Sequence, residues 1–193
     1  MSSPQPTSTH APSGSTPNRH ILSVLVENHH GVLSRVSGMF SSRGFNIDTL
    51  TVCETEDPTM SRMTMSVLGQ NVVVDQIRKQ LEKLAEVITI ENLTEQGAFL
   101  ERELALVKLR PHDQFSRANI ERMSADLGAR RVDYTDKTVT FEIVGQADYI
   151  SQYVKVASAS ADIVEIARSG VVALTRNETG QRDRFFKEVH NHG

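Results

Sequence analysis

Hydrophobic and polar residues along the chain follow first a strand pattern and then a helix pattern. Residues 21–26 form a nearly continuous apolar run, as expected of a strand that is covered on one face and paired on both edges. A polar turn containing Gly31 follows, and apolar residues then recur at helical spacing as far as Gly44, which is placed just after the helix. The chain is therefore expected to open with a central strand and an amphipathic helix.

The next stretch predicts a hairpin, a second helix and a fourth strand. Residues 46–54 and 62–69 alternate and are rich in β-branched side chains, and the polar turn 56–59 separates them. A helical stripe then precedes a strand pattern at residues 87–93; the stripe consists of Val73, Ile77, Leu81 and Leu84. The order β-α-β-β-α-β is that of a ferredoxin-like unit, in which two helices back a four-stranded antiparallel sheet.

The same order of elements repeats after about 80 residues. The second unit is predicted from two helical stripes (Ile120, Met123, Leu127; Ala147, Ile150, Val154, Ala157) and from strand patterns at 104–109, 130–134, 138–144, 163–167 and 171–174. We therefore predict an α+β chain of two tandem ferredoxin-like domains, over residues 19–95 and 103–177, with a connector at 96–102. The Ser/Pro-rich residues 1–18 are expected to be disordered, and residues 178–193 to form a flexible tail.

Composition and charge exclude several classes of function. The 193 residues include 21 Lys and Arg against 24 Asp and Glu, a net charge of -3, so no basic excess attracts the chain to nucleic acid. No run approaches the roughly 20 apolar residues of a membrane span. The single cysteine, Cys53, cannot form an internal disulfide, which fits a reducing compartment. An organelle leader would carry several arginines, and here the first arginine is Arg19. We expect a bacterial, cytoplasmic protein that oligomerises because its two units are small.

Residues that could carry out catalysis are scarce. The sequence has no Gly-rich phosphate loop, no HExxH, no GxSxG and no spaced Cys/His set. Two histidine pairs, His29-His30 and His190-x-His192, are better explained as solvated residues than as ligands, because a fixed zinc site needs four converging ligands. No metal site is expected.

The polar turn from Glu27 to Ser34 is the most informative feature. It joins a buried strand to an amphipathic helix, so unpaired backbone N–H groups and the helix dipole would favour an anion such as the α-carboxylate of an amino acid. Gly31 leaves room for a ligand, and the Asn28 side chain offers an acceptor for an ammonium and donors for a carboxylate. The alternative is structural: Gly31 only permits the turn, and Asn28 only caps the helix. The turn alone does not decide between them.

Long runs of residues, in order and spacing, resemble the small regulatory subunits of acetolactate synthase. The runs lie between residues 19 and 176, and they are RHILSVLVEN at 19–28, GVLSRV at 31–36, FSxRGFNI at 40–47, LTV at 50–52, DPTxSRMT at 57–64, QIxKQLxKL at 76–84, ERELxLVK at 101–108 and IVEIARSGVVAL at 163–174. Family members have an ACT domain, here residues 19–95, followed by a distinct C-terminal domain. The chain departs from the family in its long Ser/Pro tail and in His29-His30.

The resemblance implies an effector site shared between two chains. In proteins of this kind, two ACT domains join side by side in a homodimer and bind a branched-chain amino acid, usually valine, between them. By motif position, the effector-binding residues would be Asn28, Gly31, Val32, Leu33 and Ser34 in the strand-to-helix loop, with Asn46 and Ile47, which open the second strand, from the neighbouring chain. The side chains of Val32, Leu33 and Ile47 would shelter the isopropyl group.

The resemblance also implies a partner. The family's catalytic large subunit carries thiamine diphosphate, magnesium and FAD, and none of those sites is visible in this sequence. We therefore expect this chain to bind no cofactor and to have no activity alone, but to activate the catalytic subunit and to confer feedback inhibition. One rival, an RNA-binding module, would need exposed strand aromatics, which residues 62–67 lack. The other, a stand-alone enzyme, would turn over pyruvate without a partner.

Overall fold

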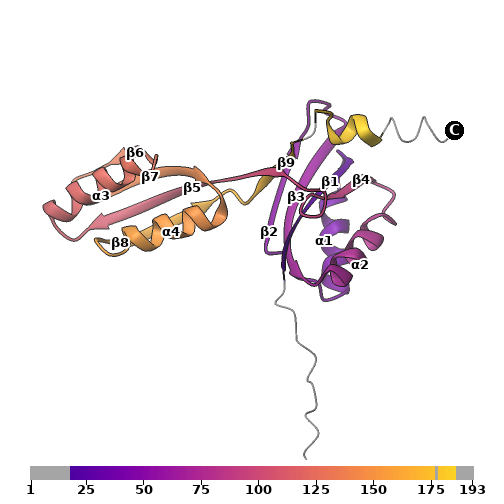
Figure 1. Cartoon of the computed structure of the whole chain (residues 1–193), viewed down its shortest axis with the longest axis horizontal. Coiled ribbons are helices and arrows are strands. Elements are labelled where there is room, and N and C mark those ends of the chain that lie inside the picture. The colour runs from indigo at the N-terminus through magenta and orange to yellow at the C-terminus, as the bar shows by residue number, and fades with distance from the viewer. Residues whose placement is uncertain (1–17, 177, 186–193) are drawn as a thin grey trace, which may run out of the picture.

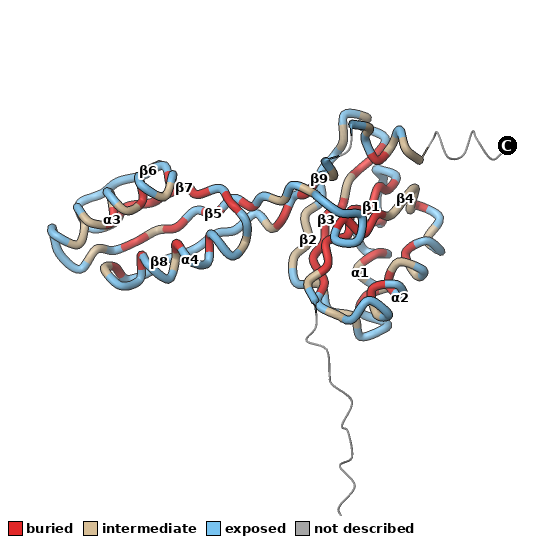
Figure 2. The backbone as a smooth tube through the Cα atoms, viewed as in Figure 1, coloured by how far each residue is buried: buried red, intermediate tan, exposed pale blue. Residues whose placement is uncertain are grey.

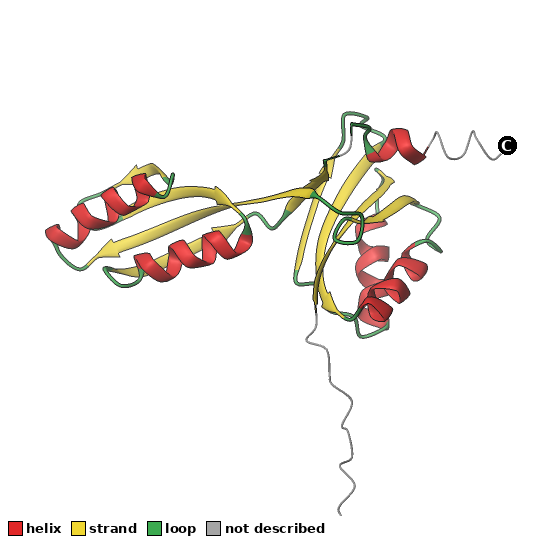
Figure 3. Cartoon of the chain, viewed as in Figure 1, coloured by secondary structure: helices red, strands yellow, loops and turns green. Residues whose placement is uncertain are grey.

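One long strand, β5 (Phe99–Pro111), joins two helix-backed antiparallel sheets that lie end to end (Figure 1). The computed structural model describes residues 18–176 and 178–185, so the predicted disordered tail, residues 1–18, lies outside them except for Asn18. Each sheet carries two helices on one face (Figure 3). The predicted α+β class with antiparallel sheets backed by helices is therefore confirmed.

The first unit has the predicted order β-α-β-β-α-β. Its elements are β1 (Asn18–Glu27), α1 (Val32–Ser42), β2 (Thr49–Glu54), β3 (Met60–Gly69), α2 (Asn71–Leu81) and β4 (Val87–Asn92). β1 lies inside the sheet order β2-β3-β1-β4 and pairs antiparallel with both neighbours, which confirms a central strand. Its residues Leu22, Val24 and Val26 pack with buried residues of both helices to form the first core. Figure 2 shows the buried stretches of β1, α1 and α2 in red.

Gly44 follows the end of α1, as predicted. It has a φ of 69°, a backbone conformation that glycine adopts without steric cost. Its N–H donates to the Ser41 carbonyl at 3.3 Å, and the Phe45 N–H donates to the Phe40 carbonyl at 3.1 Å. The rings of Phe40 and Phe45 pack edge to face across this reversal. The carbonyls of Phe40 and Ser41 thus have partners while the chain turns back toward β2.

The second unit repeats the arrangement of one sheet and two helices. Besides β5, its elements are α3 (Gln114–Asp126), β6 (Arg130–Tyr134), β7 (Val139–Gly145), α4 (Ala147–Ala157) and β8 (Ala161–Arg168). The sheet order is β6-β7-β5-β8. Alternate residues of β5, namely Ala105, Val107 and Leu109, pack against buried residues of the helices, including Ile120 and Tyr153. The strand predicted at 104–109 therefore lies within β5.

β2 begins at Thr49, so the prediction of a strand from residue 46 is wrong at its start. The reversal after α1 occupies residues 43–45, and the first backbone bond to β3 is donated by the Asp48 N–H to the Ser66 carbonyl at 2.9 Å. Asn46 and Ile47 therefore lie in the loop before the strand. A β-branched residue and period-two alternation made this loop resemble strand.

The last predicted strand of the second sheet lies in a different place. β9 (Val172–Thr175) pairs with residues 99–102 of β5, a part of the predicted connector that is strand in the structure. The resulting two-stranded arm lies against the first sheet (Figure 1), because apolar residues of the two pack together. These residues are Val171, Ala173 and Phe99 from the arm and Ile21 and Leu93 from the first unit.

Residues 178–185 of the predicted flexible tail also pack on the first unit. Gln181 is only 4% exposed, and Arg184 forms an ion pair with Glu91 at 2.7 Å. The polar sequence of this segment hid its contacts, because each contact is made with a residue far away along the chain. The remainder of the predicted tail, residues 186–193, lies outside the described residues.

Candidate functional site

The predicted turn places a glycine at the start of α1. Gly31 is the N-cap residue, with a φ of 91° and a ψ of -11°, and the Arg35 N–H donates to its carbonyl at 3.0 Å. No side chain of the described residues caps this end of the helix. The backbone N–H groups of the first turn consequently lack an acceptor within the helix, where the helix dipole also favours an anion.

Asn28 holds the hairpin turn of the neighbouring strands and does not cap α1, so the Asn28 part of the structural alternative is wrong. The Gly31 part, that glycine permits the turn, agrees with its positive φ. The Asn28 Nδ2 donates to the Glu54 Oε1 at 3.0 Å and to the Pro58 carbonyl at 2.9 Å. Its backbone N–H donates to the Thr59 carbonyl at 2.7 Å. Both amide hydrogens are therefore used, which corrects the expectation that they are donors for a ligand carboxylate. The Oδ1 atom remains as an acceptor for an ammonium.

The three residues after Gly31 differ in what they can offer a ligand. Val32 is 4% exposed and belongs to the first core, so its side chain does not reach a ligand and only its backbone is available. Leu33 is 47% exposed, and Ser34 is exposed as well. The expectation of an apolar shelter is thus corrected at Val32, while the Leu33 side chain is exposed to solvent.

Asn46 and Ile47 lie beyond the opposite end of α1. The helix has 11 residues and is therefore about 16 Å long, with Val32, Leu33 and Ser34 in its first turn and Asn46 four residues after its last residue. Asn46 is exposed, and Ile47 is partly buried against the first core. A single chain therefore does not bring these two residues to the turn at Gly31.

β2 forms an edge of the first sheet. It pairs with β3 on one side, and no other strand of the described residues pairs with its outer side. Leu50 is partly buried there, and Val52 is 36% exposed. An unpaired strand edge with apolar side chains is a surface on which another chain can add.

The turn that contacts Asn28 is closed by hydrogen bonds between Asp57 and Thr59. The Asp57 Oδ1 accepts hydrogen bonds from the Thr59 hydroxyl at 2.6 Å and from the Thr59 N–H at 3.0 Å. These bonds hold the pKa of the Asp57 carboxyl below its ordinary value. Sequence reasoning missed this contact between turn and loop, although the DPT motif at 57–59 belongs to one of the runs that carry the resemblance.

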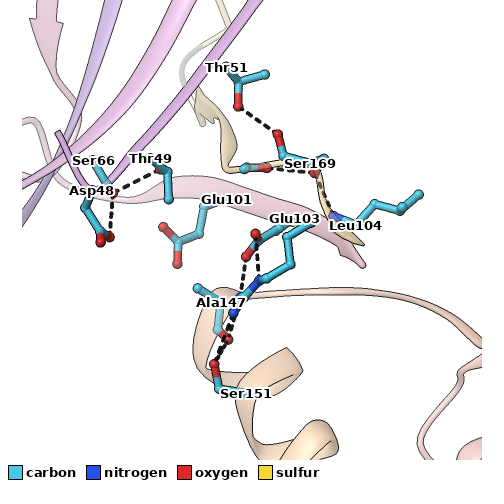
Figure 4. A network of polar contacts seen from close by, with 12 residues as sticks. Asp48, Thr49, Thr51, Ser66, Glu101, Glu103, Leu104, Ala147, Ser151 and Ser169 are labelled. Atoms are coloured by element: carbon cyan, nitrogen blue, oxygen red, sulfur yellow. Dashed lines mark hydrogen bonds and ion pairs between the residues drawn. The ribbon is translucent and has the colours of Figure 1, made fainter. Parts of the chain in front are cut away.

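A second network that sequence reasoning missed joins β2 to the second unit (Figure 4). The Thr51 hydroxyl donates to the Ser169 carbonyl at 3.3 Å, and the Ser169 hydroxyl accepts the Leu104 N–H at 3.0 Å. Next to it, the guanidinium of Arg168 holds both oxygens of buried Glu103, at 2.9 and 2.6 Å. The edge strand of the first unit is thus tied directly to the second unit.

One groove of about 490 Å³ lies between the first sheet and the β5–β9 arm. Its walls include Thr51, Arg62, Leu100 and Val172, and none of the predicted effector residues lines it. A cleft between two chains is not part of a single chain, so this groove does not test the predicted effector site.

Within residues 18–176 and 178–185, no group of three or more His, Cys, Asp or Glu side chains is arranged to hold a metal ion. No helix in this part of the chain is both long and apolar enough to cross a membrane.

Comparisons with known proteins agree over both units. The model of the AHAS small subunit-like ACT domain matches residues 22–89, and the model of the small subunit of acetolactate synthase matches residues 102–177. The chain is 44% identical over 160 residues to the acetolactate synthase isozyme 3 small subunit of Salmonella typhimurium, which covers 83% of this chain and 97% of that protein. It is 39% identical to the probable acetolactate synthase small subunit of Methanothermobacter thermautotrophicus, over 83% of this chain and 94% of that protein.

A solved structure has a similar fold over both units. The crystal structure of the acetolactate synthase small subunit from Thermotoga maritima matches with a TM-score of 0.73 at 32% sequence identity, covering 84% of this chain and 99% of that chain. Sequence and structure therefore lead to one conclusion: the chain belongs to the acetolactate synthase small subunit family, and its first unit is an ACT domain.

Proposed function

We propose that this chain activates the catalytic large subunit of acetolactate synthase and confers feedback inhibition by a branched-chain amino acid, valine in the first place. The family membership supports the regulatory role. In this proposal the chain has no activity alone, and the thiamine diphosphate, magnesium and FAD of the reaction are held by the large subunit. The observation that carries the proposal is the uncapped start of α1 at Gly31.

The effector site in this proposal lies between two ACT domains of a homodimer. The unpaired edge of β2 and the apolar side chains beside it support side-by-side pairing. Pairing of this kind would bring Asn46 and Ile47 of one protomer toward the Gly31 turn of its partner. A second chain is needed because the two groups lie at opposite ends of α1.

Each part of a small zwitterion has a matching group in this site. Backbone N–H groups of Val32, Leu33 and Ser34 would bind the carboxylate, and the Asn28 Oδ1 would accept the ammonium. Leu33 and Ile47 would contact the isopropyl group. Discrimination among valine, leucine and isoleucine rests on about 1–3 kcal/mol per methylene, so it is modest.

Inhibition requires that the effector favours one state of the assembly over another. Valine would bind more tightly to the less active arrangement and shift the population toward it. The hydrogen bond between Thr51 and Ser169 supports a route from β2 of the ACT domain into the second unit. The coupling would then reach the large subunit through both units of the chain.

The substitution Gly31→Asp tests this proposal, with Gly31→Asn as its matched control. A Cβ at this position meets no atom within 4 Å, so both side chains fit, and both share the cost of a positive φ. Asp places a carboxylate beside that of the ligand, whereas Asn has the same size without the charge. We expect Gly31→Asp to abolish valine inhibition of the reconstituted enzyme, with activation preserved and with inhibition largely retained in Gly31→Asn.

Two results would contradict the proposed site. Normal valine inhibition of the Gly31→Asp enzyme would exclude ligand binding at the start of α1. An equal loss in both variants would assign the effect to the backbone at residue 31 and not to repulsion between two carboxylates.

A further inference from the structure

The C-terminal segment 178–185 lies on the face of the ACT sheet that α1 and α2 do not cover, because it contacts Ser23, whose neighbours Leu22 and Val24 point into the helix-covered core. It follows residue 177, where the match to the family model ends. Gln181 anchors it: its Nε2 donates to the Ser23 carbonyl at 3.0 Å, and its Oε1 accepts the Ser23 hydroxyl at 2.8 Å. Arg62 also donates to this Oε1, at 2.6 Å. Gln181 and Ser23 are both buried, so these bonds are shielded from water.

Two arginines extend the anchor to both sides of Gln181. Arg184 binds both carboxylate oxygens of Glu91 on β4, each at 2.7 Å, and Glu91 is 8% exposed. On the other side, Arg182 lies 3.1 Å from the Asp57 carboxylate and 4.0 Å from Glu56. The segment therefore contacts the middle of the sheet, one edge strand and the β2–β3 turn.

The β2–β3 turn links this segment to the proposed effector loop. Within this turn the Thr59 hydroxyl donates to the Asp57 carboxylate. The Asn28 side chain donates to the Pro58 carbonyl, and the Asn28 backbone N–H donates to the Thr59 carbonyl. Asn28 is three residues before Gly31. Arg182 therefore contacts the turn at Asp57, and the turn contacts the effector loop at Asn28.

We propose that residues 178–185 act as a clamp that positions the effector loop, with Arg182 as the positioning residue. This inference rests on the proposed function for its consequence. A loop that is already held in its binding conformation loses less conformational freedom when the ligand binds, so releasing the turn weakens affinity without removing any ligand contact.

The charge reversal Arg182→Glu tests the clamp, because it places a carboxylate beside Asp57 and Glu56. Arg176→Glu is the matched control: it makes the same charge change at an exposed arginine outside the segment. In the full-length, ligand-free chain, we expect faster amide hydrogen exchange at residues 28–31 and 57–60 in Arg182→Glu only. Calorimetry with valine should then give a dissociation constant roughly three- to tenfold higher for that variant.

Hydrogen exchange and calorimetry together show whether residues 178–185 position the effector loop. Exchange and affinity that are unchanged in Arg182→Glu, or changed equally in Arg176→Glu, would overturn the clamp. A lower melting temperature of Arg182→Glu with unaltered exchange at residues 28–31 would also overturn it, because the segment would then only stabilise the fold. If the wild-type chain itself gives no heat with valine while exchange responds as expected, the clamp stands and the proposed effector site fails.

Discussion

Gly31 and Asn28 lie three residues apart and have different roles. Gly31 takes a left-handed conformation and starts α1 without a side-chain cap, which leaves backbone donors for a carboxylate. Asn28 uses its own donors on the β2–β3 turn and keeps one acceptor. A ligand at this position would therefore find N–H groups from the main chain and a single side-chain oxygen, an arrangement that suits a zwitterion.

Asn46 tests the contribution of the second protomer. Its side chain is exposed in the single chain, so removing it should leave the fold intact. We predict that Asn46→Ala weakens valine binding by at least about 1 kcal/mol, roughly fivefold, through lost hydrogen bonds. Titration calorimetry measures this, with Asn119→Ala on α3 of the second unit as the control. An affinity equal to that of the wild type would remove Asn46 from the site.

At the scale of single residues, the sequence predicted the features that depend on residues nearby along the chain. The turns at Gly31 and Gly44 were predictable because glycine conformation and helix ends are local properties. The partners of Asn28 were not, because Glu54 and Pro58 lie 26 and 30 residues away along the chain. The burial of Val32 followed the helical stripe, but it also removed that side chain from the expected site.

Among the elements, α3 offers a test of local stabilisation. Asp113 caps it by accepting the Ser116 N–H at 2.7 Å, and hydrogen bonds from Ser116 hold the pKa of the Asp113 carboxyl below its ordinary value of 3.8. Because the folded pKa is depressed, the stabilisation is present above pH 3.8 and is lost as the pH falls through the folded pKa.

We predict that Asp113→Ala lowers the urea midpoint of unfolding at neutral pH, whereas Asp113→Asn, which can still cap, stays close to the wild type. The difference in urea midpoint between the wild type and Asp113→Ala should become smaller below pH 3.8. Circular dichroism during urea titration at each pH gives these midpoints. A gap that is the same at pH 3 and pH 7 would mean that the charged cap does not stabilise α3.

The order and type of the elements followed from hydrophobic period, but their partners did not. The pattern at 171–174 correctly predicted a strand. This strand, β9, pairs with residues 99–102 of β5 and does not extend the sheet order β6-β7-β5-β8. Period-two alternation identifies which side chains share a face, and it contains no information about which sheet that face belongs to. The polar segment 178–185 carried no period at all, so its docking through Gln181 could not be predicted.

At the scale of the whole molecule, the two units are coupled through a short polar junction. Thr51 on the edge strand of the ACT domain donates to the Ser169 carbonyl, next to Gly170. Gly170 has a φ of 78°, and a Cβ there would lie 2.8 Å from the Thr51 hydroxyl oxygen, so only glycine fits this approach. The strand that would pair with a second protomer is therefore also the strand that contacts the second unit.

A valine titration of the reconstituted enzyme tests the central claim most directly. Acetolactate formation by the catalytic large subunit would be measured alone and with this chain, at increasing valine. We predict a higher rate on adding the chain, and a decrease with valine only when the chain is present. A rate that valine leaves unchanged in the presence of the chain, or that valine lowers equally in its absence, would contradict the account.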